Sequence, residues 1–116
     1  KNLQRSVHRF EPIIVTASTI TLNTSHETAL LVLTNVTSTA VSIDDSVFEL
    51  GATIHLLRDN AAGPVTVQAA GGSTVVLRVP EGKLSQARGV NSPMTIYLRE
   101  QGATEYWNIW GDLKDI

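Results

Sequence analysis

Short apolar runs separated by turn-forming residues are the feature of this sequence that most constrains its fold. From Ile13 onward these runs recur at intervals of roughly 8–12 residues, a spacing typical of β-sandwiches and jelly rolls. Val, Ile and Thr supply 33 of the 116 residues, and their branched side chains fit a pleated sheet better than a helix. The sequence therefore predicts one all-β domain, an antiparallel β-sandwich of the jelly-roll type.

Two hairpins are predicted from alternation and turn residues. Apolar and more polar side chains alternate along Thr53–Arg58 and along Val65–Ala69, as in a strand with one buried face. The residues between them, 59–64, are rich in turn-forming types. A connection of this kind predicts that the two strands pair as a β-hairpin. A second hairpin is predicted near the end of the chain, where residues 101–103 turn into a strand at 105–110.

Two of the expected strands are apolar on both faces. Residues 29–36 are almost continuously apolar, and the last strand carries aromatic side chains on both faces. A strand in an isolated sandwich needs only one apolar face, so we expect another copy of the chain to cover the second face. Loops or an aromatic rim of the same chain are the alternative cover. The predicted subunit-interface residues are Leu3, Val7, Phe10, Leu31, Leu33, Tyr106 and Trp110.

The first residues carry a different pattern. Leu3, Val7 and Phe10 are spaced four and then three residues apart, as in the seam of a coiled coil. Pro12 would end any helix at this point. Residues 1–12 are therefore expected to be the end of a stalk or a lead-in segment, and residues 13–116 a single knob domain. Because the chain begins at Lys1 without a signal-peptide pattern, we expect it to be part of a longer protein.

Composition excludes several functional classes. The net charge is −2, with acidic and basic residues well mixed, so the basic stripe of a nucleic-acid-binding protein is missing. The absence of Cys excludes disulfides and cysteine-ligated zinc. No apolar run approaches the roughly 18 residues that span a membrane. We therefore expect no cofactor, no metal, no nucleic-acid partner and no membrane span.

Catalytic chemistry has little support in the sequence. The histidines His8, His26 and His55 lack metal-ligand spacing, and no catalytic motif is found. His26 or His55 with Asp44 would be the acid–base pair of a small enzyme, but Asp and Ser residues gather in turns for local hydrogen bonding. Residues 44–46 lack the regular spacing of oxygen ligands in a calcium loop. The chain is therefore predicted not to be an enzyme.

Ligand contacts are predicted in loops and, alternatively, on aromatic rings. Loops on a rigid scaffold often carry recognition, and the candidate binding residues in two polar loops are Arg58, Asp59, Asn60, Lys83, Gln86, Arg88 and Asn91. The aromatic residues Tyr97, Tyr106, Trp107 and Trp110 would form a sugar-stacking platform if exposed. Their position within strands favours packing in the core or at an interface.

Three stretches of the chain together resemble a known group of viral domains. They are residues 28–44, 50–75 and 87–113, and they contain Leu33-Thr34-Asn35, Gly51 to Ile54, Gly63 to Val67, Arg88-Gly89, and Glu105 to Leu113. In this order they resemble the β-rich C-terminal domains of bacteriophage tail fibres, tailspikes and tail needles. The shared motifs are structural glycines, turns and tryptophans, and the resemblance covers about three-quarters of the chain.

The resemblance implies a non-enzymatic, distal domain of a homotrimeric phage tail appendage. Such a domain is part of the virion and acts outside the host, by binding a bacterial surface receptor, a saccharide among the candidates, or by penetrating the cell envelope. Some of these domains are jelly rolls similar to tumour necrosis factor on a coiled-coil stalk. No receptor-contacting residue carries over to this sequence.

A carbohydrate-binding module of a larger hydrolase is the alternative function. It predicts a solvent-exposed Trp107 or Trp110, and saccharide binding that is lost when either is replaced by alanine.

Overall fold

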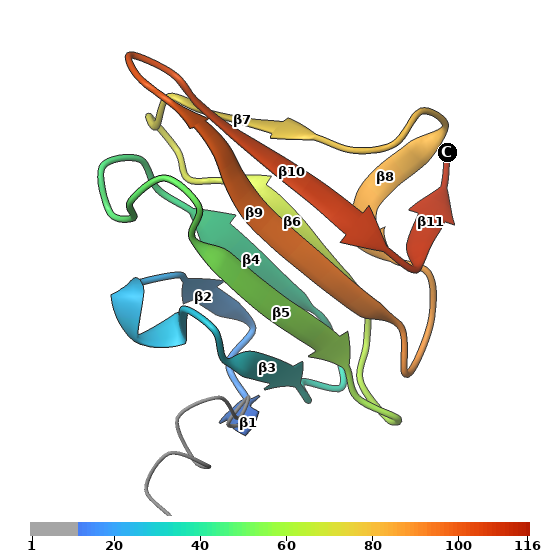
Figure 1. Ribbon diagram of the computed structural model, residues 1–116. Helices are drawn as coiled ribbons and strands as arrows, with labels where there is room; N and C mark the ends of the chain where they lie inside the picture. Colours follow the sequence, from blue (N-terminus) through green and yellow to red (C-terminus); the bar gives the residue numbers. More distant parts are fainter. Residues whose placement is uncertain (1–11) are drawn as a thin grey trace, which may run out of the picture.

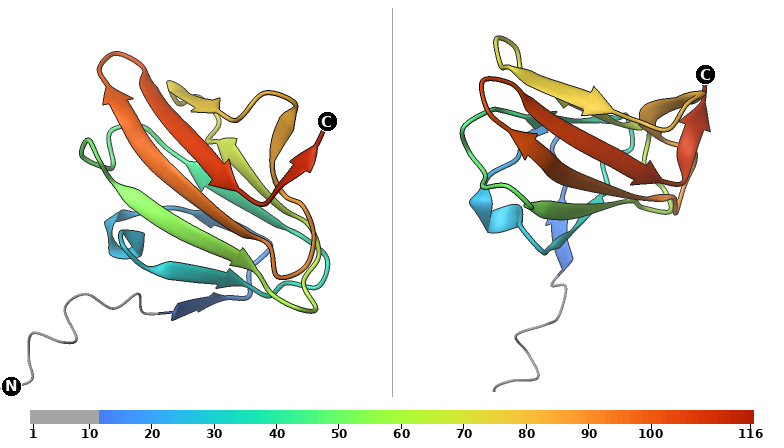
Figure 2. Two further views of the ribbon diagram at one scale, coloured as in Figure 1. Left: turned by 45° about the vertical axis from the view of Figure 1, so that its right-hand side comes forward. Right: turned by 45° about the horizontal axis from the view of Figure 1, so that its top comes forward.

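The computed structural model describes residues 12–116, and within them the chain is all β-structure apart from one short 3₁₀ helix. Its strands form two sheets that face each other (Figures 1 and 2). The elements are β1 (Pro12–Val15), β2 (Thr19–Thr21), η1 (Thr24–His26), β3 (Leu30–Leu33), β4 (Thr39–Ile43), β5 (Thr53–Arg58), β6 (Val65–Ala69), β7 (Val75–Arg78), β8 (Lys83–Ala87), β9 (Pro93–Gln101), β10 (Glu105–Gly111) and β11 (Leu113–Asp115). The all-β prediction is confirmed. The predicted stalk residues Leu3, Val7 and Phe10 lie outside the described residues.

Successive strands alternate between the two sheets from β1 to β9. One sheet has the order β1-β3-β5-β9-β10-β7, and the other has the order β11-β8-β6-β4-β2. Because the chain changes sheet after each of these strands, β1, β3 and β5 run parallel, as do β2, β4 and β6. Both sheets are therefore mixed, and the prediction of an antiparallel sandwich is wrong.

The first predicted hairpin is also wrong in its pairing. Thr53–Arg58 and Val65–Ala69 are strands with the predicted bounds, but β5 and β6 lie in different sheets. The connection between them crosses from one sheet to the other, where Thr39 N donates to the Pro64 carbonyl at 2.8 Å. The second predicted hairpin, formed by β9 and β10, is confirmed as an antiparallel pair.

The core lies between the sheets and is filled by alternate residues of each strand. Trp107 is fully buried at its centre, and the Phe48 ring packs edge-on against it with centroids 5.4 Å apart. The other fully buried large side chains are Leu22, Leu31, Leu33, Val41, Ile43, Ile54, Leu56, Met94, Ile96, Leu98 and Ile109. Most alternate with partly or fully exposed residues along their strands, as expected for sheets with one face in the core.

Candidate functional site

The outer face of the five-stranded sheet is mostly polar, although it includes Ala40 and the exposed Leu84. Cross-strand neighbours on this face are Thr19, Ala40, Thr66 and Gln86 in one row, and Thr21, Ser42 and Gln68 in the next. Gln68 Nε2 donates to Ser42 Oγ at 3.1 Å. This composition is typical of a solvated sheet face, and it places the predicted ligand residue Gln86 among short polar side chains.

The outer face of the six-stranded sheet begins with an aliphatic patch, which we define as Ile14, Leu30, Val32 and Leu57. Ile14 of β1 pairs with Val32 of β3, which in turn pairs with Leu57 of β5, so the three side chains form one row. Ile14 exposes 60% of its surface. A row of branched aliphatic side chains facing water is unusual for a solvated sheet face.

The predicted interface residues Leu31 and Leu33 belong to the opposite face of the same strand. Both are fully buried inside the chain and have no surface to offer to a second subunit. Because side chains alternate along a strand, it is their neighbours Leu30 and Val32 that face outward.

The same outer face continues into an aromatic patch, which we define as Tyr97, Tyr106 and Trp110. Trp110 exposes 46% of its surface, and its ring centroid lies 6.2 Å from that of Tyr97. Arg78 stacks over the Tyr106 ring, 4.0 Å from its centroid. Trp107 is fully buried on the other face of β10, so the sugar-stacking prediction is wrong for Trp107 and stays open for the three residues of the aromatic patch.

A polar pair lies between the two patches. His55 of β5 and Thr95 of β9 are cross-strand neighbours, and His55 Nδ1 is 3.0 Å from Thr95 Oγ1. Thr95 is also the cross-strand neighbour of Trp110. The row therefore runs from Leu30 through His55 and Thr95 to Trp110, from aliphatic to polar to aromatic.

Four of the seven predicted ligand residues lie together in the structure: Arg58, Asp59, Asn60 and Asn91. Asn91 N donates to the Arg58 carbonyl at 2.7 Å, and Asn91 Nδ2 donates to Asn60 Oδ1 at 3.2 Å. Asp59, between Arg58 and Asn60, donates its backbone N–H to the Leu33 carbonyl. These residues form one loop cluster at the end of β5. Their hydrogen bonds to one another hold the two loops together.

Two further predicted ligand residues are held in ion pairs. Arg88 binds both carboxylate oxygens of Asp112 at 2.8 Å, and Ser92 Oγ donates to the same carboxylate. The pKa of Asp112 is lowered by these hydrogen bonds, more by the one from Arg88 than by the one from Ser92. In turn, the Asp112 carboxylate raises the pKa of Arg88. Lys83 pairs with Asp115 at 2.5 Å. The Arg88–Asp112 pair thus fastens the start of the β8–β9 connection to the corner between β10 and β11.

His26, Asp44 and Asp45 take part in local hydrogen bonds, and His8 lies outside the described residues. His26 is buried, and its Nδ1 accepts a hydrogen bond from Asn23 N at 3.0 Å in a capping box that begins η1. Asp45 accepts hydrogen bonds from the N–H and hydroxyl of Thr74, and Asp44 accepts from the N–H of Asp45. Within residues 12–116, no group of three or more His, Cys, Asp or Glu side chains is placed to hold a metal ion.

The burial of His26 predicts that the fold loses stability in acid. Burial lowers the pKa of His26 below its usual 6.5, because the folded chain favours the neutral ring. As the pH falls below 6.5, the unfolded chain takes up a proton before the folded chain does, so the free energy of unfolding falls until the pH passes the folded pKa. Urea titrations between about pH 7.5 and pH 5 should show this fall in wild type and in His55→Gln, and a smaller one in His26→Gln. An equal fall in His26→Gln would contradict the prediction.

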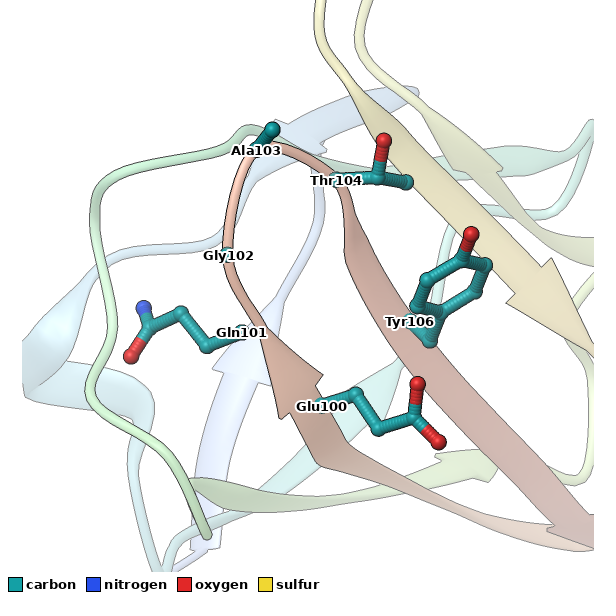
Figure 3. A pocket seen from close by; sticks show the side chains of 6 residues that line it. All are labelled: Glu100, Gln101, Gly102, Ala103, Thr104 and Tyr106. Atoms are coloured by element: carbon teal, nitrogen blue, oxygen red, sulfur yellow. The ribbon is translucent and has the colours of Figure 1, made fainter.

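A shallow hollow lies at the tip of the β9–β10 hairpin (Figure 3). It measures about 350 Å³ and is lined by Glu100, Gln101, Gly102, Ala103, Thr104 and Tyr106. Its single carboxylate, Glu100, lies 3.9 Å from Arg78 and 3.6 Å from Arg99. The Gln101 side chain instead donates to the Phe48 carbonyl. The lining contains no nucleophile–base pair and no paired carboxylates, so the hollow offers no catalytic set.

Sequence reasoning missed the residues that make the outer face of the six-stranded sheet distinctive. Leu30, Val32 and Leu57 were within predicted strands, but parity alone does not say which face of a doubly apolar strand is the outer one. Asn108, between Tyr106 and Trp110 on β10, also escaped notice. Its Oδ1 is buried and has no hydrogen-bond partner among the described residues.

Comparison of the chain with protein-family models, with curated proteins and with solved structures gives no match. Among the described residues, no helix is long and apolar enough to cross a membrane.

Proposed function

We propose that this chain is the distal domain of a homotrimeric bacteriophage tail appendage, which contacts the bacterial surface without catalysing a reaction. The observation that carries the proposal is the difference between the two outer faces. One face is built mainly from Thr, Ser and Gln, with Ala40 and the exposed Leu84 among them. The other face carries the aliphatic patch, in which Ile14 is exposed and Leu30, Val32 and Leu57 are partly buried. An exposed apolar sheet face of this kind is typical of a surface that meets another copy of the chain.

The position of the aliphatic patch supports a trimer around the N-terminal end. The patch begins on β1, the edge strand that directly follows residues 1–11. Leu3, Val7 and Phe10 have coiled-coil spacing. If three copies of that segment associate, their β1 strands start around the same axis, and the aliphatic patches are brought close to it.

The resemblance to phage tail domains supports the rest of the proposal. The two facing sheets agree with a sandwich-type knob. The parallel pairings of β1, β3 and β5 distinguish this chain from an all-antiparallel jelly roll. A trimer presents three copies of each surface loop, and weak contacts at linked sites combine into a much stronger attachment.

The mass of the chain in solution tests the trimer. Light scattering of residues 1–116 at micromolar concentration should give three chains of 12.5 kDa each. Val32→Glu would place three carboxylates in the apolar interface and should shift the mass to one chain. Thr66→Glu, a matched change on the polar outer face, should leave the trimer intact. A monomeric wild-type chain would contradict the proposal, and a monomer that binds saccharide would favour the carbohydrate-binding module.

A further inference from the structure

The surroundings of Trp110 combine exposed rings with uncharged hydrogen-bonding groups. Trp110 and Tyr97 lie on adjacent strands with their ring planes inclined by 47°. Thr95 is the direct cross-strand neighbour of Trp110, and Asn108 is the cross-strand neighbour of Tyr97. Cross-strand neighbours have Cβ atoms about 5 Å apart. One ligand ring stacked on Trp110 would therefore be within reach of the Thr95 hydroxyl and the Asn108 amide.

Asn108 is the second observation that indicates a ligand. Its Oδ1 is shielded from solvent yet accepts no hydrogen bond from any residue of the described chain. A buried carbonyl without a donor is unfavourable, and native structures rarely leave one without a reason. It lies on the same face as Tyr106 and Trp110, so a ligand hydroxyl that enters between these side chains would supply the missing donor.

The charge of this surface limits what the ligand can be. Three charged side chains lie beside the aromatic patch: Arg78, which is the cross-strand neighbour of Asn108, and Arg99 and Glu100 of β9. The Glu100 carboxylate lies 3.9 Å from Arg78 and 3.6 Å from Arg99, and Arg78 is stacked on Tyr106. Around Trp110 and Tyr97 the side chains are Thr53, Thr95, Asn108 and the imidazole of His55. Hydroxyl and amide groups beside exposed rings complement an uncharged polyhydroxylated ligand. A phosphate-rich or strongly acidic ligand would require a concentration of positive charge here.

We infer that the aromatic patch, together with Thr95 and Asn108, binds a neutral saccharide. The apolar CH face of a sugar ring stacks on Trp110, with Tyr97 as a second, inclined wall. The sugar hydroxyls bond to Thr95 and Asn108. A few polar groups around an apolar stacking surface are the usual composition of a small-molecule site.

This inference deepens the proposed function, because it names the chemical class of the bacterial receptor. The saccharide site and the proposed subunit contact use different parts of one sheet. The aliphatic patch lies on β1, β3 and β5, the aromatic patch lies on β9 and β10, and the hydrogen-bonded His55 and Thr95 lie between them. A trimer would therefore carry three separate saccharide sites.

The test is a titration of the full 116-residue chain with neutral oligosaccharides of glucose, galactose, mannose and N-acetylglucosamine. Isothermal calorimetry should show saturable binding of at least one of them. Trp110→Ala should weaken this binding at least about tenfold, Trp110→Phe should retain most of it, and Thr95→Ala should weaken it less than Trp110→Ala does. Thr66→Ala, on the opposite outer face, should have no effect.

The outcomes separate this inference from the proposed function. A trimer that binds none of the four sugars overturns the saccharide site and leaves the tail-appendage proposal standing. A monomer that binds one of them through Trp110 supports the site and contradicts the trimer. Saccharide binding that survives Trp110→Ala overturns the inference, because the Trp110 ring would then not be the stacking surface. A Trp110→Ala chain that loses its trimeric mass also overturns it, because the ring would then lie in a subunit contact.

Discussion

Replacing Gly63 with alanine is expected to prevent the β5–β6 crossover from forming its native geometry. A Cβ atom at this position would lie 2.1 Å from the Thr37 carbonyl oxygen and 2.8 Å from that of Val36. Both contacts are to backbone, which no side-chain rotation can relieve. Overpacking usually lowers the free energy of unfolding by about 1–3 kcal/mol where side chains can adjust. Because the backbone here cannot adjust in this way, we expect Gly63→Ala to lower the free energy of unfolding by about 3 kcal/mol or more.

The crossover is tightly held, which is why it cannot move aside. Gly63 N donates to the Asn35 carbonyl at 2.9 Å, and Asn35 Oδ1 accepts from the backbone N–H groups of Thr37 and Ser38. Thermal denaturation followed by circular dichroism should show a melting temperature lowered by roughly 10–20 °C. Gly71→Ala is the control, since a Cβ there meets no atom within 4 Å. Equal melting temperatures for the two variants would contradict the predicted backbone clash.

Trp107→Ala is expected to remove about 3–5 kcal/mol from the free energy of unfolding. The side chain is fully buried and packs against Phe48. Its Nε1 also donates to Glu105 Oε1 at 3.2 Å, and Glu105 is a buried carboxylate that accepts from Ser46 N and Gln101 Nε2 as well. The substitution therefore opens a large cavity and removes one of three donors from a buried carboxylate.

Trp110→Ala is the matched control, because it removes the same side chain three residues along the same strand. Trp110 keeps nearly half of its surface in water, so its loss should cost about 1 kcal/mol or less. Urea denaturation of the two variants at one protein concentration measures the difference. Equal decreases in the free energy of unfolding for the two variants would contradict the prediction that the buried Trp107 contributes more to stability than the exposed Trp110.

Alternation along the strands was predictable because it is a local property. The bounds of β5 and β6 match the alternating runs Thr53–Arg58 and Val65–Ala69, and the buried side chains of these strands follow the same parity. Spacing alone also placed Trp107 and Ile109 on one face of β10 and Tyr106 and Trp110 on the other, but the structure decided that the face of Trp107 is the buried one. A side chain's face depends only on its position along its own strand.

The partner of each strand was not predictable in the same way. The residues between β5 and β6 have the composition of a hairpin turn, yet the chain crosses to the other sheet. In this crossover Gly63 lies against the backbone at Thr37, and these residues come together only in the folded chain. The composition of a segment indicates how readily it forms a turn, but not which sheet the next strand joins.

For the candidate site, too, the residue types could be predicted from the sequence but their neighbours could not. Tyr97, Tyr106 and Trp110 could be singled out as aromatic residues of two paired strands. Their relation to Thr95, His55 and Asn108 depends on the register of β5, β9 and β10. Of the predicted loop residues, Asp59, Asn60, Arg88 and Asn91 lie in connections, whereas Arg58 ends β5 and Lys83 and Gln86 belong to β8, so their placement in loops was wrong. Arg88 and Lys83 are also paired with Asp112 and Asp115, which lie more than twenty residues away in the sequence.

By itself, the sequence determined that this chain is all β-structure, where several of its strands begin and end, and that two of those strands are apolar on both faces. Each of these properties follows from side-chain branching, alternation or turn residues within a few positions. The tertiary structure alone decided that the sheets are mixed, that Leu30 and Val32 face outward while Leu31 and Leu33 fill the core, and that an aliphatic and an aromatic patch share one outer face. These depend on which distant segments pair and in what register, and that choice is made by the packing of the whole chain.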